Sequence, residues 1–180
     1  MKFMNLIGAA VALACVAGAP AHAVTLNWTL HNVAFNDGGT ASGTFSTDSA
    51  NGQVTAFNIG TTAGTIRGAA AYNPATSTVF GYNIFSANSF TIVTKNTFNP
   101  YLNLSFAHTL ASGGVNTLNV GGPGAGSWEC SNCDALRSVI SGSASTVPEP
   151  ASWALMLVGF GGLGMALRAQ RRTVRVAVAV

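Results

Sequence analysis

The chain has 180 residues, 8 of them basic and 5 acidic, for a net charge of +3. Lys2 and the arginines after residue 167 account for this excess. Residues 24–146 hold three basic residues against four acidic ones, a net charge of −1: Arg67, Lys95 and Arg137 against Asp37, Asp48, Glu129 and Asp134. This central part therefore has no basic patch for a nucleic acid and no charged stripe for a membrane surface.

The first 23 residues have the layout of a secretory signal peptide. Lys2 gives a basic start, an apolar stretch runs from Leu6 to Val16, and Ala21-His22-Ala23 forms a cleavage signal. Cleavage after Ala23 predicts a mature chain that starts at Val24. A lipoprotein start at Cys15 is a minor alternative, because Leu13 lies one position too near for the usual lipobox.

Residues 24–146 are predicted to form one extracellular β domain. Val24, Leu26, Trp28 and Leu30 alternate with polar residues, and the phase then slips at His31-Asn32, which predicts a strand with a bulge. Turn signals follow at Asp37-Gly38-Gly39 and at Asn51-Gly52, the strongest hairpin signal in the chain.

Later segments continue the period of two residues. The cleanest alternation runs from Leu102 to Leu110 and places His108 on the apolar face. A last strand is predicted from Leu136 to Ser145, although the Ser-Gly-Ser-Ala-Ser-Thr stretch before Val147 also fits a linker. The pattern predicts an all-β fold, a single antiparallel β-sandwich or jelly-roll-like domain with almost no helix.

Few residues of this domain suggest chemistry. After signal removal Cys130 and Cys133 are the remaining cysteines, and a structural disulfide is favoured over redox chemistry, a metal site or free thiols. The glycine-rich run 121–126 lacks the Lys and Ser/Thr of a phosphate loop, and there is no G-x-S-x-G motif. We therefore expect no enzyme, no cofactor and no metal site. Trp28 is expected in the core and Trp128 as an exposed aromatic residue that can stack on sugars.

The end of the chain predicts a second membrane segment. Ala151 to Leu167 holds no charge and would extend about 25 Å as a helix, slightly short of a hydrocarbon core. Trp153 suits the outer interface, and Arg168, Arg171 and Arg172 would hold the far end in the cytoplasm. An ordinary single-pass tail anchor fits the same features.

Pro148-Glu149-Pro150, Trp153-Ala154, the glycine-rich apolar run and the arginines resemble the PEP-CTERM sorting signal in its PEPxxWA variant. The resemblance covers residues 147–172, with the transmembrane helix at about 151–167 and residues 173–180 as an additional cytoplasmic tail. It implies a Gram-negative source and recognition by an exosortase, a membrane protease-transpeptidase that would cleave near the triplet. The precursor would be anchored in the inner membrane only transiently, and the body would then reach the cell surface or the extracellular space.

The resulting expectation is an exported, non-enzymatic protein of the surface or the extracellular matrix, associated with exopolysaccharide in a biofilm. Exosortase is the expected processing partner, and exopolysaccharide is a further partner. A lectin-like carbohydrate-binding module is the alternative, and exposed aromatic residues on one sheet face would favour it. A secreted hydrolase comes third and would need an accessible pair of carboxylates in a cleft.

Overall fold

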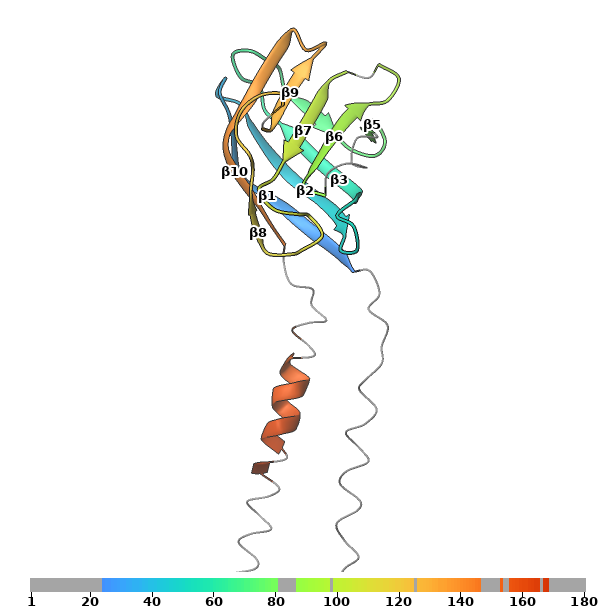
Figure 1. Ribbon diagram of the computed structural model, residues 1–180, viewed down its shortest axis with the longest axis vertical. Coiled ribbons are helices and arrows are strands. Elements are labelled where there is room, and N and C mark those ends of the chain that lie inside the picture. Colours follow the sequence, from blue (N-terminus) through green and yellow to red (C-terminus); the bar gives the residue numbers. More distant parts are fainter. Residues whose placement is uncertain are drawn as a thin grey trace, which may run out of the picture.

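The computed structural model describes residues 24–80, 87–97, 99–124, 126–146, 153, 156–165 and 167–168. In this part of the chain ten strands form one antiparallel sheet with the order β4-β3-β2-β1-β10-β9-β7-β6-β5, and β8 pairs with β10 off this path (Figure 1). The strands are β1 (Thr25–Phe35), β2 (Thr40–Asp48), β3 (Val54–Thr61), β4 (Ala70–Tyr72), β5 (Ser77–Phe80), β6 (Ser89–Thr94), β7 (Tyr101–Ser105), β8 (Val115–Thr117), β9 (Trp128–Ser131) and β10 (Ala135–Thr146).

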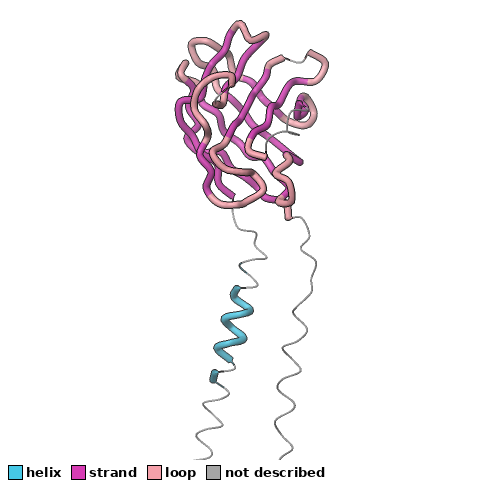
Figure 2. Tube along the Cα trace, in the orientation of Figure 1, coloured by secondary structure: helices cyan, strands magenta, loops and turns pink. Residues whose placement is uncertain are grey.

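Strand β10 joins the two halves of the sheet. Its first residues, 135–138, pair with β9, whereas its later residues, 139–146, pair with β1. Strands β4 and β5 form the two edges, and they follow each other in the chain through a turn at residues 73–76. The sheet therefore curls until its two edges approach each other, and it is nearly closed (Figures 1 and 2).

The core lies inside this curved sheet. Phe45 of β2 contacts Phe90 of β6 and Phe106, with ring centroids 5.0 and 5.6 Å apart, so side chains from both halves meet. Trp28 of β1 stacks on Phe45 and is 1% exposed, as expected for a core residue. Its indole N–H donates to Thr47 Oγ1, which satisfies the polar atom that burial would otherwise leave without a partner.

The bulge predicted in the first strand is present. The register of β1 shifts between Thr29 and Val33 against β2, and between His31 and Ala34 against β10. Asn32 adopts a left-handed conformation with φ of 52°, and asparagine tolerates this region better than most residues. The shift keeps Trp28, Leu30, Val33 and Phe35 buried although their spacing changes along the strand.

Both predicted turns connect the expected strands. Residues 36–39 join β1 to β2, with Gly38 at φ of 85°, and residues 49–53 join β2 to β3, with Gly52 at φ of 73°. The stretch 141–146 belongs to β10, so the structure decides between strand and linker in favour of the strand.

The run from Leu102 to Leu110 is not one strand. Strand β7 ends at Ser105, and Phe106 makes an isolated bridge with Leu118. The chain then turns, so His108 is exposed and does not face the core. The side chain of Asn116 holds this turn, because it accepts from the His108 N–H and donates to the His108 carbonyl. The alternation of apolar and polar residues does not predict these two hydrogen bonds of Asn116.

The fold class is antiparallel β, as predicted, but the topology differs from a jelly roll. Along the path, neighbouring strands are consecutive in the chain except where β1 meets β10 and where β9 meets β7. A jelly roll is instead built from Greek-key connections. The chain thus forms a nearly closed, mainly up-and-down sheet with its first strand paired to its last.

Beyond the body, residues 156–165 are helical, as are residues 153, 167 and 168. Within the described part of the chain, no helix has both the length and the apolar character that crossing a bilayer requires. The transmembrane helix at 151–167 therefore stays a prediction. The signal peptide lies outside the described residues.

Candidate functional site

The most unusual feature of the body is a buried cluster of charged side chains, Asp37, Arg67, Glu129 and Arg137, which we call the charged cluster. Asp37 follows β1, Arg67 lies in the loop after β3, and Glu129 and Arg137 face each other on hairpin β9–β10. The side chains of Asp37, Glu129 and Arg137 are 0% exposed and that of Arg67 is 8% exposed. The two positive and two negative charges balance inside the sheet.

Arg137 is the centre of the charged cluster. Its Nε donates to Glu129 Oε2 at 2.7 Å, and its Nη1 lies 3.3 Å from Asp37 Oδ2 and donates to the Thr62 carbonyl at 2.9 Å. Its Nη2 is 2.5 Å from Glu129 Oε2 but lacks hydrogen-bond geometry, so we treat this contact as purely ionic. The guanidinium also lies 4.2 Å from the centre of the Phe35 ring, a cation–π contact.

The second oxygen of Glu129 accepts from two hydroxyl groups and forms an ion pair with a second arginine. The Tyr72 hydroxyl donates to Oε1 at 2.6 Å, the Thr61 hydroxyl donates at 3.1 Å, and Arg67 Nη2 lies 3.5 Å away. Burial, together with the negative charge of Glu129, raises the pKa of Tyr72 far above its ordinary value. Tyr72 is therefore protonated at every physiological pH and acts as a hydrogen-bond donor.

Asp37 holds the loop of residues 62–67 against the turn between β1 and β2. Its carboxylate accepts from the backbone N–H groups of Gly39, Ile66 and Arg67, and its carbonyl accepts from the Thr65 N–H. Burial raises the pKa of Asp37, but the Gly39 N–H and the Arg137 guanidinium outweigh burial and bring this pKa below its ordinary value. Asp37 is thus ionised in the folded protein.

Two glycines leave the space that the charged cluster occupies. A Cβ at Gly64 would lie 2.3 Å from the Asp37 carboxyl carbon, and one at Gly39 would lie 2.3 Å from Arg137 Nη1. Neither residue has a left-handed backbone, so space rather than conformation demands glycine here.

Sequence reasoning missed the charged cluster because its residues come from distant parts of the chain; Asp37 and Arg137, for example, are 100 positions apart. One signal was present. Arg137 and Val139 share a strand face, and Val139 belongs to the core, so Arg137 points inward. An arginine on a core-facing position needs a buried carboxylate, which Glu129 supplies from the opposite position of the hairpin.

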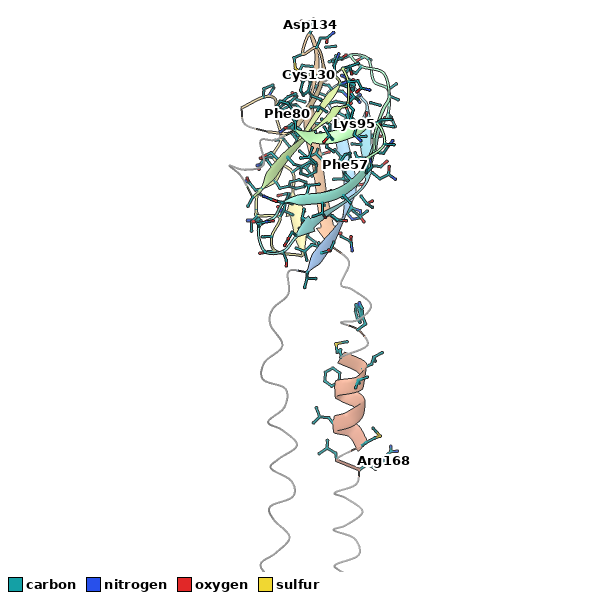
Figure 3. All side chains as sticks on the ribbon, turned by 90° about the vertical axis from the view of Figure 1, so that its right-hand side faces the viewer. Phe57, Phe80, Lys95, Cys130, Asp134 and Arg168 are labelled. Carbon is teal, nitrogen blue, oxygen red and sulfur yellow. A yellow bond between two sulfur atoms is a disulfide. The ribbon has the colours of Figure 1, made fainter. Side chains whose placement is uncertain are left out.

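Cys130 and Cys133 form a disulfide at the tip of hairpin β9–β10, with Cα atoms 4.7 Å apart. Cys130 is buried, whereas Cys133 is exposed and, like Asn132, adopts a left-handed conformation. Asn132 and Asn99 exchange hydrogen bonds, which ties this tip to the turn between β6 and β7. Figure 3 shows Cys130 and Asp134 at this end of the body. The disulfide thus closes the turn of the hairpin that carries Glu129 and Arg137.

Of the triplet, tryptophan and arginines named for the predicted sorting signal, Trp153 and Arg168 lie in the described part of the tail. Trp153 is helical and 53% exposed, and Arg168 is helical at the other end (Figure 3). The remaining predicted residues lie outside the described ones: Ala21, Ala23, Pro148, Glu149, Pro150, Arg171 and Arg172. The structure therefore leaves the sorting and cleavage residues as predictions.

In the described residues the chain thus consists of an antiparallel β body, which ends at Thr146, and an apolar helical segment at residues 156–165. The family model of the PEP-CTERM protein-sorting motif matches residues 146–172, so the chain carries this motif. The motif indicates processing by an exosortase and sorting of the body, through a membrane-anchored form, to the outside of the cell. No curated protein and no solved structure matches the chain.

Proposed function

We propose that the protein is a non-enzymatic component of the cell surface or the extracellular matrix, cut from its tail by an exosortase and associated with exopolysaccharide. The observation that carries this proposal is the sorting motif at residues 146–172, which begins at the residue where β10 ends. The enzyme that reads the motif would therefore act directly beside a completed β body.

The surface of the body supports a place in a hydrated, neutral matrix. Four of its charged residues are in the charged cluster, which leaves Asp48, Lys95 and Asp134 outside it. The outer face of the first strands instead carries a row of short polar side chains, Asn58, Thr44, Thr29 and Ser145, on β3, β2, β1 and β10. Hydroxyl and amide groups exchange hydrogen bonds with sugar hydroxyls without requiring charge.

The charged cluster favours a structural over a catalytic role. The carboxylates of Asp37 and Glu129 are 0% exposed, and arginine and backbone or hydroxyl donors contact both of them. A pair of carboxylates for glycoside hydrolysis needs access to the scissile bond. This observation argues against the hydrolase hypothesis and supports the non-enzymatic proposal.

A carbohydrate-binding module is the second candidate, and one observation favours it. Tyr101 and Trp128 are partly exposed aromatic residues that lie on neighbouring strands, β7 and β9, and point outward on the same face of the sheet.

The sorting proposal is tested by replacing Pro148, Glu149 and Pro150 together with alanine. Neither the apolar length nor the arginines change, so insertion is expected to be normal. Processing is expected to fail, and the full-length form should accumulate in the inner membrane, whereas the wild-type body should appear shorter and outside. Immunoblotting of membrane and extracellular fractions distinguishes the two forms by size and location.

The matched control is a strain without the exosortase, in which the wild-type chain should behave like the triple variant. A wild-type protein that remains full length and membrane-bound in cells with a working exosortase would contradict the proposal. In that case the tail is an ordinary anchor, and the triplet is only a stiff spacer.

A further inference from the structure

Strands β5, β6, β7, β9 and the first part of β10 present an outward surface with three aromatic residues, Phe80, Tyr101 and Trp128. We call this surface the aromatic face. Register pairs place one row of outward side chains across these five strands, because directly paired residues share a face. The row is Phe80, Thr91, Asn103, Trp128 and Ser138.

The opposite side of the same strands faces the core. Ile92, Leu102, Glu129 and Arg137 are paired in the next row along and are buried. The neighbours Trp128 and Glu129 therefore point to opposite sides of β9. Because the charged cluster fixes Glu129 inside, it also fixes Trp128 outside.

The aromatic face is preorganised. The Asn103 amide donates to Thr91 Oγ1, on the paired position of β6, at 2.8 Å, and this hydrogen bond fixes the orientation of the Asn103 side chain. Tyr101 packs edge-on against Phe80, with ring centroids 6.3 Å apart and planes at 88°. Trp128, Tyr101 and Phe80 are half-buried, so each ring is supported by the sheet while part of it is accessible. Rigid aromatic surfaces lose little conformational entropy on binding.

The aromatic face carries no charge. The second row of paired residues consists of Thr78, Val93, Tyr101, Cys130 and Leu136. Val93 and Cys130 are buried, so this row adds only Thr78, Tyr101 and Leu136 to the accessible surface, and none of these three carries a charge. A polyanion binds through lysine and arginine, and these strands direct their one arginine inward. Charge complementarity therefore selects a neutral ligand.

The size of the aromatic face suits an extended ligand. Strands β9 and β5 are three strand steps apart, which at about 4.8 Å a step corresponds to about 14 Å. This length exceeds one sugar ring. Aromatic rings contact the C–H faces of sugars, and the amide and hydroxyl groups between them match sugar hydroxyls.

We propose that the aromatic face binds a neutral polysaccharide chain that lies across β9, β7 and β6. Trp128 and Tyr101 stack on sugar rings, and Asn103 hydrogen-bonds the hydroxyl groups between them. This inference rests on the proposed association with polysaccharide and specifies its location and its charge. It is independent of how the tail is processed.

The test uses affinity electrophoresis of the exported protein in gels that contain a neutral polysaccharide (dextran, galactomannan or hydroxyethyl cellulose) or the anionic alginate. At least one neutral polysaccharide should retard the wild type, and alginate should not. Trp128→Ala should weaken retardation at least about tenfold. Asn103→Ala should weaken it less, and Trp128→Phe should retain most of it because a ring remains.

Gln53→Ala, at an exposed amide in the turn between β2 and β3 in the other half of the sheet, is the matched control for Asn103→Ala and should bind like the wild type. Thermal unfolding of each variant separates lost binding from lost folding, and Asn103→Ala keeps the test decisive if Trp128→Ala does not fold. Retardation by none of the neutral polysaccharides, or binding that Trp128→Ala and Asn103→Ala leave unchanged, would overturn the proposal. So would dimerisation that depends on Trp128, because it would assign the aromatic face to a second copy.

Immunoblots of the same strains keep this inference distinct from the sorting proposal. Trp128→Ala should be processed and released like the wild type. Failed processing with intact glycan binding contradicts the sorting proposal alone, whereas normal processing without binding contradicts the aromatic face alone.

Discussion

The buried charges favour one arrangement of the segments that carry them, and they make the body sensitive to the loss of any one of these charges. Arg137 contacts three segments that are far apart in the chain. It binds Asp37 in the β1–β2 turn, the Thr62 carbonyl in the loop after β3, and Glu129 in hairpin β9–β10. A buried ion pair adds little net stability over apolar residues of equal size, but removal of one partner leaves an uncompensated charge. The charged cluster therefore defines one arrangement of these segments and penalises others.

Glu129→Gln should destabilise the folded body strongly. The substitution keeps the side-chain shape but removes the charge that faces Arg137 and Arg67. We expect a loss of about 3–5 kcal/mol in the free energy of unfolding, measured as a lower urea midpoint. Asp134→Asn, at the exposed tip of the same hairpin, is the control and should change stability by less than about 0.5 kcal/mol. Equal midpoints for both variants would show that the charge at residue 129 is unimportant.

The ionisation of Asp37 makes stability depend on pH in acid. Its folded pKa lies below the unfolded value of about 3.9, so the folded state gains stability from this carboxylate above that pH. The gain is lost as the pH falls through the unfolded value toward the folded pKa. Asp37→Asn should therefore lose stability at pH 7 and show a shallower decline in acid. Urea unfolding between pH 3 and pH 7 measures both effects, and an unchanged slope would contradict this assignment.

At the scale of strands, close backbone contacts determine where glycine is required. Gly43 of β2 has φ of 130°, and a Cβ there would lie 2.2 Å from the Asn58 carbonyl oxygen on β3. Gly60 of β3 lies in open space, with nothing within 4 Å of its Cβ position. The two glycines belong to one strand pair but carry different constraints.

Gly43→Ala should destabilise the protein by about 1–3 kcal/mol, because it combines backbone strain with a steric clash. The melting temperature should fall by several degrees. Gly60→Ala provides the matched control in the same pair of strands and should stay within about 0.5 kcal/mol of the wild type. A larger effect at Gly60 than at Gly43 would mean that the β2–β3 register differs from the one described.

Local patterns in the sequence predicted the individual elements well. The slip at His31-Asn32 predicted the bulge, and the glycines at 38 and 52 predicted two turns, because each signal depends on neighbouring residues alone. The end of β7 after Ser105 was not predictable from alternation, since the side chain of Asn116 holds the turn that follows.

For the whole molecule, the sequence predicted the antiparallel β class but not the pairing of the first strand with the last one. Trp28 pairs with Thr146, and no local signal links residues so far apart. The charged cluster could not be predicted either, because its residues are also far apart in the chain. Only the core-facing position of Arg137 indicated that a buried carboxylate was needed. The sequence predicted only part of the aromatic face. Trp128 was expected to be accessible, but which residues of β7 and β6 lie beside it depends on the strand register, which only the structure provides.

The position of β10 has a mechanical consequence. The sorting motif begins where this strand ends, so any tension on the tail enters the body along β10. Strand β10 pairs with β1 along one edge and with β8 and β9 along the other. The hydrogen bonds of β10 run across the strand direction. A pull along the strand therefore loads many of these bonds together instead of opening them one after another. While the body is still tethered, the strand that bears the load is also the one that joins the two halves of the sheet.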